Sequence, residues 1–98
     1  MVRRLSIRPE AEAEITEAHD WYEERKVGLG AEFLDEVRRA LSAIEDSPEQ
    51  YAIIRNGVRR RILDRFPYSI LYLAEPTEIV VLACFHGKRD PKRWRSRT

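Results

Sequence analysis

An uninterrupted apolar run near the end of the chain, I-V-V-L-A-C-F over residues 79–85, limits the possible fold more than any other feature. A strand in which every side chain is apolar needs cover on both of its faces. We therefore expect residues 78–85 to form a central strand of a sheet. Helices cover one face in this interpretation, and the other face is covered by the chain itself or by a partner.

Two segments before this run carry apolar residues at intervals of three or four, as one face of a helix does. The residues are Ala11, Ile15, Ala18 and Tyr22 in the first segment, and Phe33, Leu34, Val37, Leu41 and Ile44 in the second. Pro9 suits the first position of a helix, and Pro48 ends the second helix. Gly28 as a left-handed cap and Gly30 as a flexible entry predict a tight connection. We expect a helical hairpin over about 9–47.

The remaining elements are strands. Leu5 and Ile7 alternate with polar residues and predict a short strand before the hairpin. Asn56-Gly57 favours a two-residue turn between a run at 51–55 and a strand from 58 to 63, with later strands at 68–73 and 78–85. The first strand would join this antiparallel sheet at an edge or beside the last strand. The sequence thus predicts an α+β fold in which a helical hairpin packs on a small antiparallel sheet.

The length of 98 residues predicts a single domain, 1–98, with a sheet over about 51–86 and a basic tail at 87–98. The one cysteine, Cys84, has no partner for a disulfide and favours a buried, inert thiol in a reducing compartment over a reactive site. The chain shows neither the apolar core of a signal peptide nor a run of about 20 apolar residues. We expect a cytoplasmic protein that does not enter a membrane.

The net charge of +1 conceals a strong separation of charge. Residues 9–49 hold thirteen acidic and four basic side chains, whereas residues 58–98 hold four acidic and ten basic ones. Either the two halves attract each other within the folded chain, or the second half meets an acidic or polyanionic partner. The acidic side chains of the first helix, which include Glu14, are expected on its surface.

Three consecutive arginines stand in the strand that follows the turn. Side chains alternate along a strand, so Arg59 and Arg61 share one face and Arg60 lies on the other. We expect Arg59 and Arg61 to be exposed, Val58 and Ile62 to be buried, and Arg60 to lie near the margin of the sheet.

No phosphate-binding glycine loop, metal-ligand spacing or nucleophile elbow is present, so we expect neither a cofactor nor a metal. His86 is the only obvious base near the basic cluster. An RNA-cleaving site could combine His86 with Arg61 and Arg65 on the phosphate, because arginine supplies charge but is a poor base. The alternative is that His86 is a hydrogen-bonded surface residue at a strand end. His19, on the acidic helix, is expected in solvent.

Aromatic side chains in the second half leave alternatives open. Trp94 either anchors the tail to the core or offers a platform on which a base stacks. Tyr68 and Tyr72 are expected to bury their rings in the sheet and to keep their hydroxyl groups in water.

The chain resembles the RelE/ParE superfamily of toxins from bacterial type II toxin–antitoxin modules, the plasmid-stabilisation systems. The likeness covers nearly its whole length. The segments that carry it are A-E-A-E-I-T-E-A-H-D-W-Y-E, G-L-G-A-E-F-L-D-E-V, S-P-E-Q-Y, V-R-R-R-I-L-D-R-F-P-Y-S-I-L-Y and H-G-K-R-D-P-K-R-W. The most specific are R-F-P-Y and the H-x-x-R-D-P-x-x-W ending. The resemblance implies the strand, helical hairpin and antiparallel sheet described above, and neutralisation by an antitoxin whose C-terminal segment wraps the toxin.

The resemblance also separates two functions. Toxins of the RelE type cleave messenger RNA at the ribosome, and those of the ParE type are associated with poisoning of DNA gyrase. The long hairpin, the R-F-P-Y segment and the R-D-P-K-R-W ending are more similar to the ParE branch. This implies a binding toxin rather than an enzyme. An endoribonuclease of the RelE type is the alternative, and a weakly toxic or inactive chain that serves only as antitoxin partner is another.

These hypotheses assign roles to two groups of residues. The expected contacts with the target are Arg89, Lys92, Arg93 and Trp94. The expected contacts with the antitoxin, in a hetero-oligomer, are Arg59, Arg61, Arg65 and Tyr68.

Overall fold

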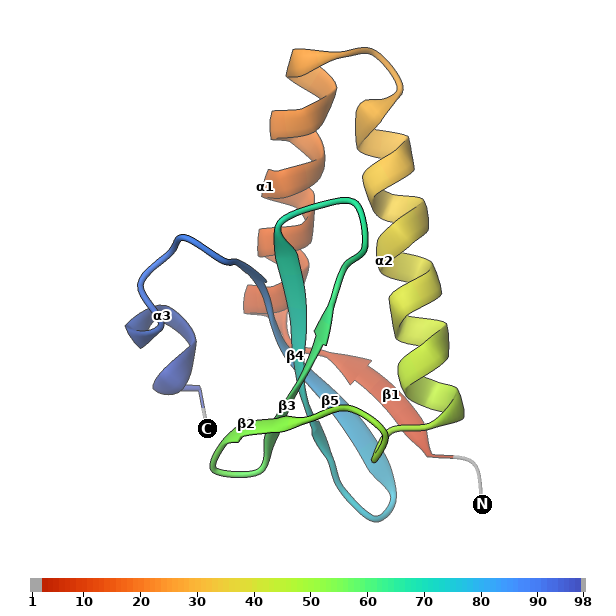
Figure 1. The fold of residues 1–98 in the computed structure, drawn as a ribbon, viewed down its shortest axis with the longest axis vertical. Helices are drawn as coiled ribbons and strands as arrows, with labels where there is room; N and C mark the ends of the chain where they lie inside the picture. Colours follow the sequence, from red (N-terminus) through yellow and green to blue (C-terminus); the bar gives the residue numbers. More distant parts are fainter. Residues whose placement is uncertain (1–2, 98) are drawn as a thin grey trace.

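The computed structural model describes residues 3–97 (Figure 1). A strand is followed by two long helices, four further strands and a short helix. In chain order the elements are β1 (Arg4–Ile7), α1 (Pro9–Arg25), α2 (Leu29–Asp46), β2 (Ile53–Arg55), β3 (Val58–Ile62), β4 (Tyr68–Ala74), β5 (Glu78–His86) and α3 (Lys92–Arg95). The predicted α+β fold and the order from β1 to β5 are confirmed, and the predicted basic tail contains the short helix α3.

The five strands form one sheet in the order β1-β5-β4-β3-β2. From β2 to β5 they run as the predicted antiparallel meander, and Asn56 and Gly57 form its first turn with φ values of 47° and 80°. β1 lies at the edge beside β5, as predicted, but pairs in parallel, with Arg4 opposite Glu78 and Ile7 opposite Val81. The sheet is therefore mixed, because β1 and β5 run in the same direction whereas the other neighbouring strands run in opposite directions.

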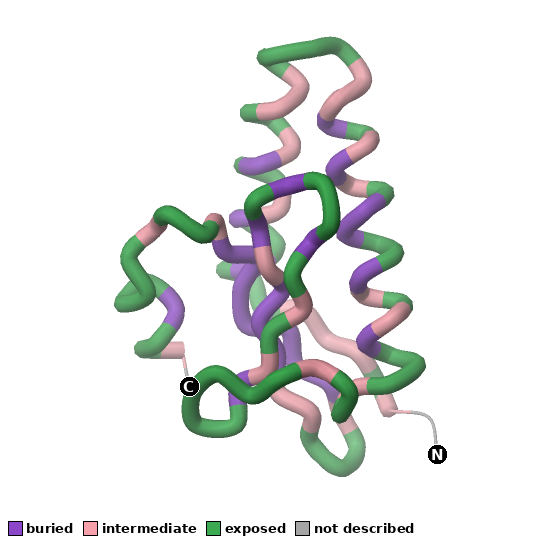
Figure 2. Tube along the Cα trace, viewed as in Figure 1, coloured by how far each residue is buried: buried purple, intermediate pink, exposed green. Residues whose placement is uncertain are grey.

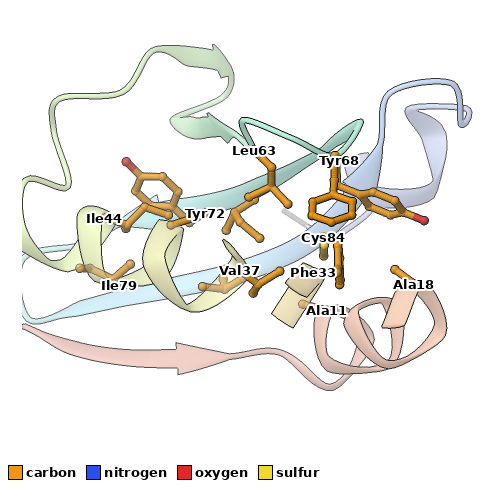
Figure 3. Close-up of a cluster of buried hydrophobic side chains, with 14 residues drawn as sticks. Ala11, Ala18, Phe33, Val37, Ile44, Leu63, Tyr68, Tyr72, Ile79 and Cys84 are labelled. Atoms are coloured by element: carbon orange, nitrogen blue, oxygen red, sulfur yellow. The ribbon is translucent and has the colours of Figure 1, made fainter. Parts of the chain in front are cut away.

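Both faces of β5 are buried, as its apolar sequence predicts. On one face it shares a large core with α1, α2 and β4, which includes Phe33, Ile44, Tyr72 and Cys84 (Figure 3). The face turned away from α1 and α2 is called here the far face. It holds a second buried cluster, formed by Val58, Leu71, Val80, Leu82, Ala83, Phe85 and Trp94. A bulge opposite Leu71 and Tyr72 lets the consecutive residues Leu82 and Ala83 both join the far-face cluster.

The hairpin begins and turns where the sequence predicts. Pro9 opens α1 after an extended Arg8, and Gly28 adopts a φ of 91° in front of α2. Gly30, however, is not a flexible entry to the second helix. It lies inside α2, where a Cβ atom would come within 2.7 Å of the His19 ring. Gly30 thus permits the close approach of the two helices, and it leaves His19 partly covered rather than fully in solvent.

Glu14 is buried, which corrects the expectation that it lies on the surface of α1. Its side chain accepts a hydrogen bond from the backbone N–H of Cys84 at 3.1 Å and pairs with Arg97 at 2.9 Å. β1 pairs with β5 only as far as Val81, so the N–H of Cys84 has no strand partner on that edge. The carboxylate of Glu14 satisfies this donor, and burial of the charge follows from that need.

Two further expectations about single side chains are wrong. Ile62 is 54% exposed, because the far-face cluster reaches Val58 but does not extend to the end of β3. The hydroxyl of Tyr72 is not in water, since it donates a hydrogen bond of 2.6 Å to the carbonyl oxygen of Pro48. Buried residues otherwise follow the sheet and the helix faces turned toward it (Figure 2).

Candidate functional site

The arginines of β3 point to the faces opposite to those expected. Arg59 and Arg61 stand opposite residues of β4 that belong to the core under the helices. Both are therefore half-buried on the helix side, and Arg60 is exposed on the far face. The expected exposure is wrong because Val58, which shares a face with Arg60, packs into the far-face cluster and not under the helices.

Acceptors within the chain already hold the two helix-side arginines of β3. Arg59 Nη1 donates to the carbonyl oxygens of Glu49 and Tyr51 at 3.0 and 2.7 Å. The guanidinium of Arg61 lies 5.6 Å from the centre of the Tyr51 ring, and its Nη1 is 3.7 Å from Asp64 Oδ1. Both positive charges therefore have partners within the chain, and the buried Nε of Arg61 makes no hydrogen bond within residues 3–97.

Arg65 is held in the same way by two acids of α2. Its Nη2 lies 2.7 Å from Glu32 Oε1, and its backbone N–H donates to Glu36 Oε2 at 2.8 Å. The bond from Arg65 lowers the pKa of the Glu32 carboxyl. Glu36 is buried, and it anchors the loop between β3 and β4 to the hairpin.

The far face carries a groove of about 280 Å³ between β2, β3 and the tail. We call it the basic groove, because Arg55, Arg60, Arg89 and Arg95 line it around an apolar floor that includes Leu71, Phe85 and Trp94. Arg55 and Arg60 are exposed and make no ion pair with any residue in the range 3–97. Neither was predicted as a binding residue. The alternation of Arg60 with the apolar Val58 was the one available signal.

Residues 87–97 fold back onto the sheet. Trp94 is 4% exposed within the far-face cluster, so it anchors the tail and its ring is not available to a target. Lys92 and Arg93, beside it on α3, are exposed. Arg89 is half-buried and its Nη2 pairs with Glu17 Oε1 on α1 at 2.9 Å.

A larger hollow, of about 660 Å³, lies between α1 and the adjoining ends of β4 and β5. We call it the α1 hollow; its lining is Glu17, Asp20, Trp21, Tyr22, Glu24, Pro67, Tyr68, His86 and Arg89. The Nδ1 atom of His86 accepts a hydrogen bond from the N–H of Lys88 at 3.0 Å. In a neutral ring the hydrogen is then on Nε2, which is the atom left for an outside contact.

Tyr68 forms part of the floor of the α1 hollow. Its ring meets that of His86 edge to face, with 5.0 Å between the centroids. Only 7% of Tyr68 is exposed, and its hydroxyl points away from the core cluster without a hydrogen-bond partner among residues 3–97 (Figure 3). Burial raises the pKa of both Tyr68 and Tyr22, so both hydroxyl groups are protonated at neutral pH.

Residues 5–91 match the family described as the ParE toxin of type II toxin–antitoxin system, parDE. The chain belongs to this ParE toxin family. The fold is similar to a solved structure titled "Chromosomal ParDE TA system from P. aeruginosa", with a TM-score of 0.74 at 20% sequence identity. The similarity covers 87% of this chain and 96% of that one. No curated protein matches the sequence.

The ParE family match includes the hairpin, the sheet and the whole α1 hollow, and it ends just before α3. Lys92, Arg93 and Trp94 therefore lie beyond the matched segment. Any role for α3 has to be argued from this chain's own residues.

Of the three residues of the alternative ribonuclease site, only one lines the α1 hollow of this ParE-family chain. His86 lines the α1 hollow, and neither Arg61 nor Arg65 does. Both arginines are instead engaged with nearby acids, Asp64 and Glu32. A cleaving site needs a base and free cations around one phosphate, and the charges of Arg61 and Arg65 are paired with these acids.

The described part of the ParE-family toxin offers neither a metal site nor a membrane span. Within residues 3–97, no three or more His, Cys, Asp or Glu side chains are grouped so that they could hold a metal ion. No helix in that range is long and apolar enough to cross a membrane. Cys84 is a buried free thiol, as predicted, and burial raises its pKa to about 12.

Proposed function

We propose that this chain is the toxin of a type II module, that it acts by binding rather than by catalysis, and that DNA gyrase is its target. Positive charge left unneutralised on one side of the molecule supports the proposal. Arg55 and Arg60 in the basic groove, with Lys92 and Arg93 on α3, make no ion pair within residues 3–97. A surface of this kind attracts a partner with the opposite charge and fixes its orientation.

Lys92 and Arg93 are the proposed contacts with gyrase. Both are exposed on a helix that the buried Trp94 fixes to the far face, so Trp94 positions them and does not touch the target. Arg89 has a similar supporting role, because its guanidinium is already bound to Glu17. The family match and the resemblance to the ParE branch favour gyrase over the ribosome.

The antitoxin is proposed to bind the far face at the β2 edge. Ile54 and Ile62 are large apolar side chains exposed on this face, and Ile53, opposite Arg59, is exposed on the other face of the β2 edge. β2 is the last strand of the sheet, and its outer edge can pair with an added strand. We expect an acidic and apolar antitoxin segment here. Arg59, Arg61 and Arg65, whose charges are already held, are not needed for it.

The decisive test for the target is a supercoiling assay with purified gyrase and purified toxin. We expect supercoiling to be lost, and the reversed charges of Lys92→Glu and Arg93→Glu together to restore it. Arg39→Glu, an exposed arginine on α2, is the matched control. Full supercoiling at excess toxin, in cells that nevertheless stop growing, rules gyrase out. Cleaved transcripts in those cells would favour a ribonuclease. If the cells do not stop growing, the chain is an inactive toxin.

The antitoxin contact is tested by titrating the cognate antitoxin against the toxin. Replacement of both Arg55 and Arg60 by alanine should weaken binding about tenfold or more, because each contact to an acidic group contributes about 1 kcal/mol. Affinity should also fall as salt rises from low to moderate concentration. Unchanged affinity of the double variant, or affinity independent of salt, contradicts this placement.

A further inference from the structure

The α1 hollow differs in charge from the basic groove. Three carboxylates line it, those of Glu17, Asp20 and Glu24, against one guanidinium, that of Arg89. Glu17 already neutralises Arg89 at 2.9 Å. Glu24 is exposed and makes no ion pair within residues 3–97. Asp20 Oδ1 lies 2.9 Å from His19 Nδ1, so Glu24 is the one carboxylate of the three without such a contact within residues 3–97. The hollow still has an excess of negative charge, on a molecule whose far face is positive.

Aromatic rings form much of the wall between these carboxylates. Trp21 is 50% exposed, and its ring meets that of Tyr22 edge to face with 5.1 Å between centroids. Tyr68 and His86 continue the wall toward β5. Rings and carboxylates together recognise organic cations, because the ring face attracts the charge while the acid accepts its hydrogen bonds.

Two of the chain's own arginines make such contacts, Arg25 beside the hollow and Arg89 in its wall. The guanidinium carbon of Arg25 lies 4.1 Å from the centre of the Trp21 ring. The guanidinium of Arg89 lines the hollow and donates to Glu17 at 2.9 Å. A planar guanidinium therefore suits these walls both stacked on a ring and paired with an acid.

Tyr68 adds a hydrogen-bonding group to the lining of the hollow. Its side chain is more than nine-tenths buried, it lines the hollow, and its hydroxyl has no hydrogen-bond partner among the described residues. The ring is covered, but the hydroxyl oxygen keeps contact with solvent at the hollow, where a ligand can reach it. The hydroxyl oxygen can accept a hydrogen bond from a guanidinium that enters between Tyr68 and Glu24.

We propose that the α1 hollow binds the side chain of an arginine presented by a partner protein, with Glu24 and Asp20 pairing with its charge and Tyr68 accepting a hydrogen bond. The volume of about 660 Å³ leaves room for the residues on either side of that arginine. Arg89 lines both this hollow and the basic groove, but the residues proposed to hold the arginine are not among the proposed gyrase and antitoxin contacts, so the site does not depend on them.

The test uses three probes on the full chain. They are a short blocked peptide with one arginine between glycines, the same peptide with citrulline, and agmatine as a free guanidinium. NMR of the Trp21 indole N–H and of the Tyr68 ring protons follows binding. We expect the arginine peptide to bind at least about tenfold tighter than the citrulline peptide, because citrulline keeps the shape and loses the charge. If agmatine binds as tightly as the peptide, the ligand of the hollow is a small amine and not an arginine of a partner protein, and the proposal is overturned.

Two variants locate the site. Tyr68→Phe and Glu24→Gln should each lower the affinity for the arginine peptide about five- to tenfold, because each removes one hydrogen bond or charge pair. Glu12→Gln, an exposed acid on α1 outside the hollow, should have no effect. Both positions tolerate substitution, since the Tyr68 hydroxyl has no partner in the described chain and Glu24 is exposed. Equal binding of arginine and citrulline, or unchanged binding by both variants, overturns the proposal.

Discussion

Beyond the end of β1, the carboxylate of Glu14 takes the place of a strand as hydrogen-bond partner of β5. It accepts hydrogen bonds from the backbone N–H of Cys84 and from both terminal nitrogens of Arg97, at distances from 2.9 to 3.1 Å. Arg97 Nη1 also donates to the carbonyl oxygen of Leu82 at 3.0 Å. One ion pair thus satisfies a backbone donor and a backbone acceptor on the open edge of β5.

Glu14→Gln should lower the free energy of unfolding by about 2 kcal/mol, because it leaves the charge of Arg97 partly buried without its counter-ion. Glu12→Gln, on the exposed side of the same helix, should change it by less than about 0.5 kcal/mol. Urea denaturation measures both values. Equal midpoints for the two variants would show that the pair with Arg97 contributes nothing to stability.

The buried thiol of Cys84 predicts a loss of stability in alkali. Its pKa rises from the ordinary 9.0 to about 12 in the folded chain because of desolvation. Above about pH 9 the unfolded chain releases this proton and the folded chain keeps it, so unfolding becomes easier as pH rises. The contribution is fully present below pH 9 and is lost toward pH 12.

Between about pH 9.5 and 11, the free energy of unfolding of the natural chain should therefore fall faster than that of Cys84→Ala, by about 1.4 kcal/mol per pH unit. The difference between the two chains removes the effect of every other titrating group. Parallel curves in denaturation experiments across this range would mean that the thiol ionises equally in both states.

At the scale of elements, the contact between α1 and α2 depends on one missing side chain. A Cβ atom on Gly30 would lie 2.7 Å from His19 Cδ2 and 2.9 Å from Glu23 Oε1. Glu23 also accepts the N–H groups of Gly28 and Gly30, which lowers the pKa of its carboxyl. The start of α2 is thus fixed by α1 through the space that glycine leaves.

Gly30→Ala should destabilise the chain by about 1 kcal/mol or more, although alanine favours a helix over glycine by a similar amount. Removing the obstacle in His19→Ala/Gly30→Ala should recover part of this loss. Gly28→Ala is the contrasting case. Its cost comes from a φ of 91° with open space around it, so His19→Ala should not relieve it. Thermal denaturation distinguishes the two patterns.

At the scale of the whole molecule, the two tryptophans have opposite functions. Trp94 closes the far face of the sheet, and Trp21 stands half-exposed at the α1 hollow. Trp94→Ala should cost about 3 kcal/mol or more and expose an apolar surface that binds a hydrophobic dye. Trp21→Ala should cost less than about 1 kcal/mol. If both variants unfold at the same denaturant concentration, the tail does not contribute to the core.

The sequence predicts the parts of this fold that local pattern controls. The helical hairpin, the Asn56-Gly57 turn and the interior position of 79–85 depend on periodicity and on backbone preference. The buried acids could not be predicted, because the N–H groups that Glu14 and Glu36 satisfy belong to distant segments. No local pattern marks a carboxylate as the partner of a donor far along the chain.

The candidate surfaces were partly predictable for the same reason. Alternation correctly separates Arg60 from its two neighbours, but it does not say which face the helices cover. That choice decides which arginines are free. His86 and Arg89 were singled out from the sequence, whereas the acids and rings that surround them come from α1 and meet them only in the folded chain.

The parallel pairing of β1 with β5 has a consequence for synthesis. Residues 4–7 have no strand to pair with until residues 78–81 have been made, because their partners stand near the other end of the chain. Such a long-range closure also slows folding. A nascent toxin therefore remains without its complete sheet during most of its translation. During this time a partner that is already present in the cell can bind the chain before β1 pairs with β5.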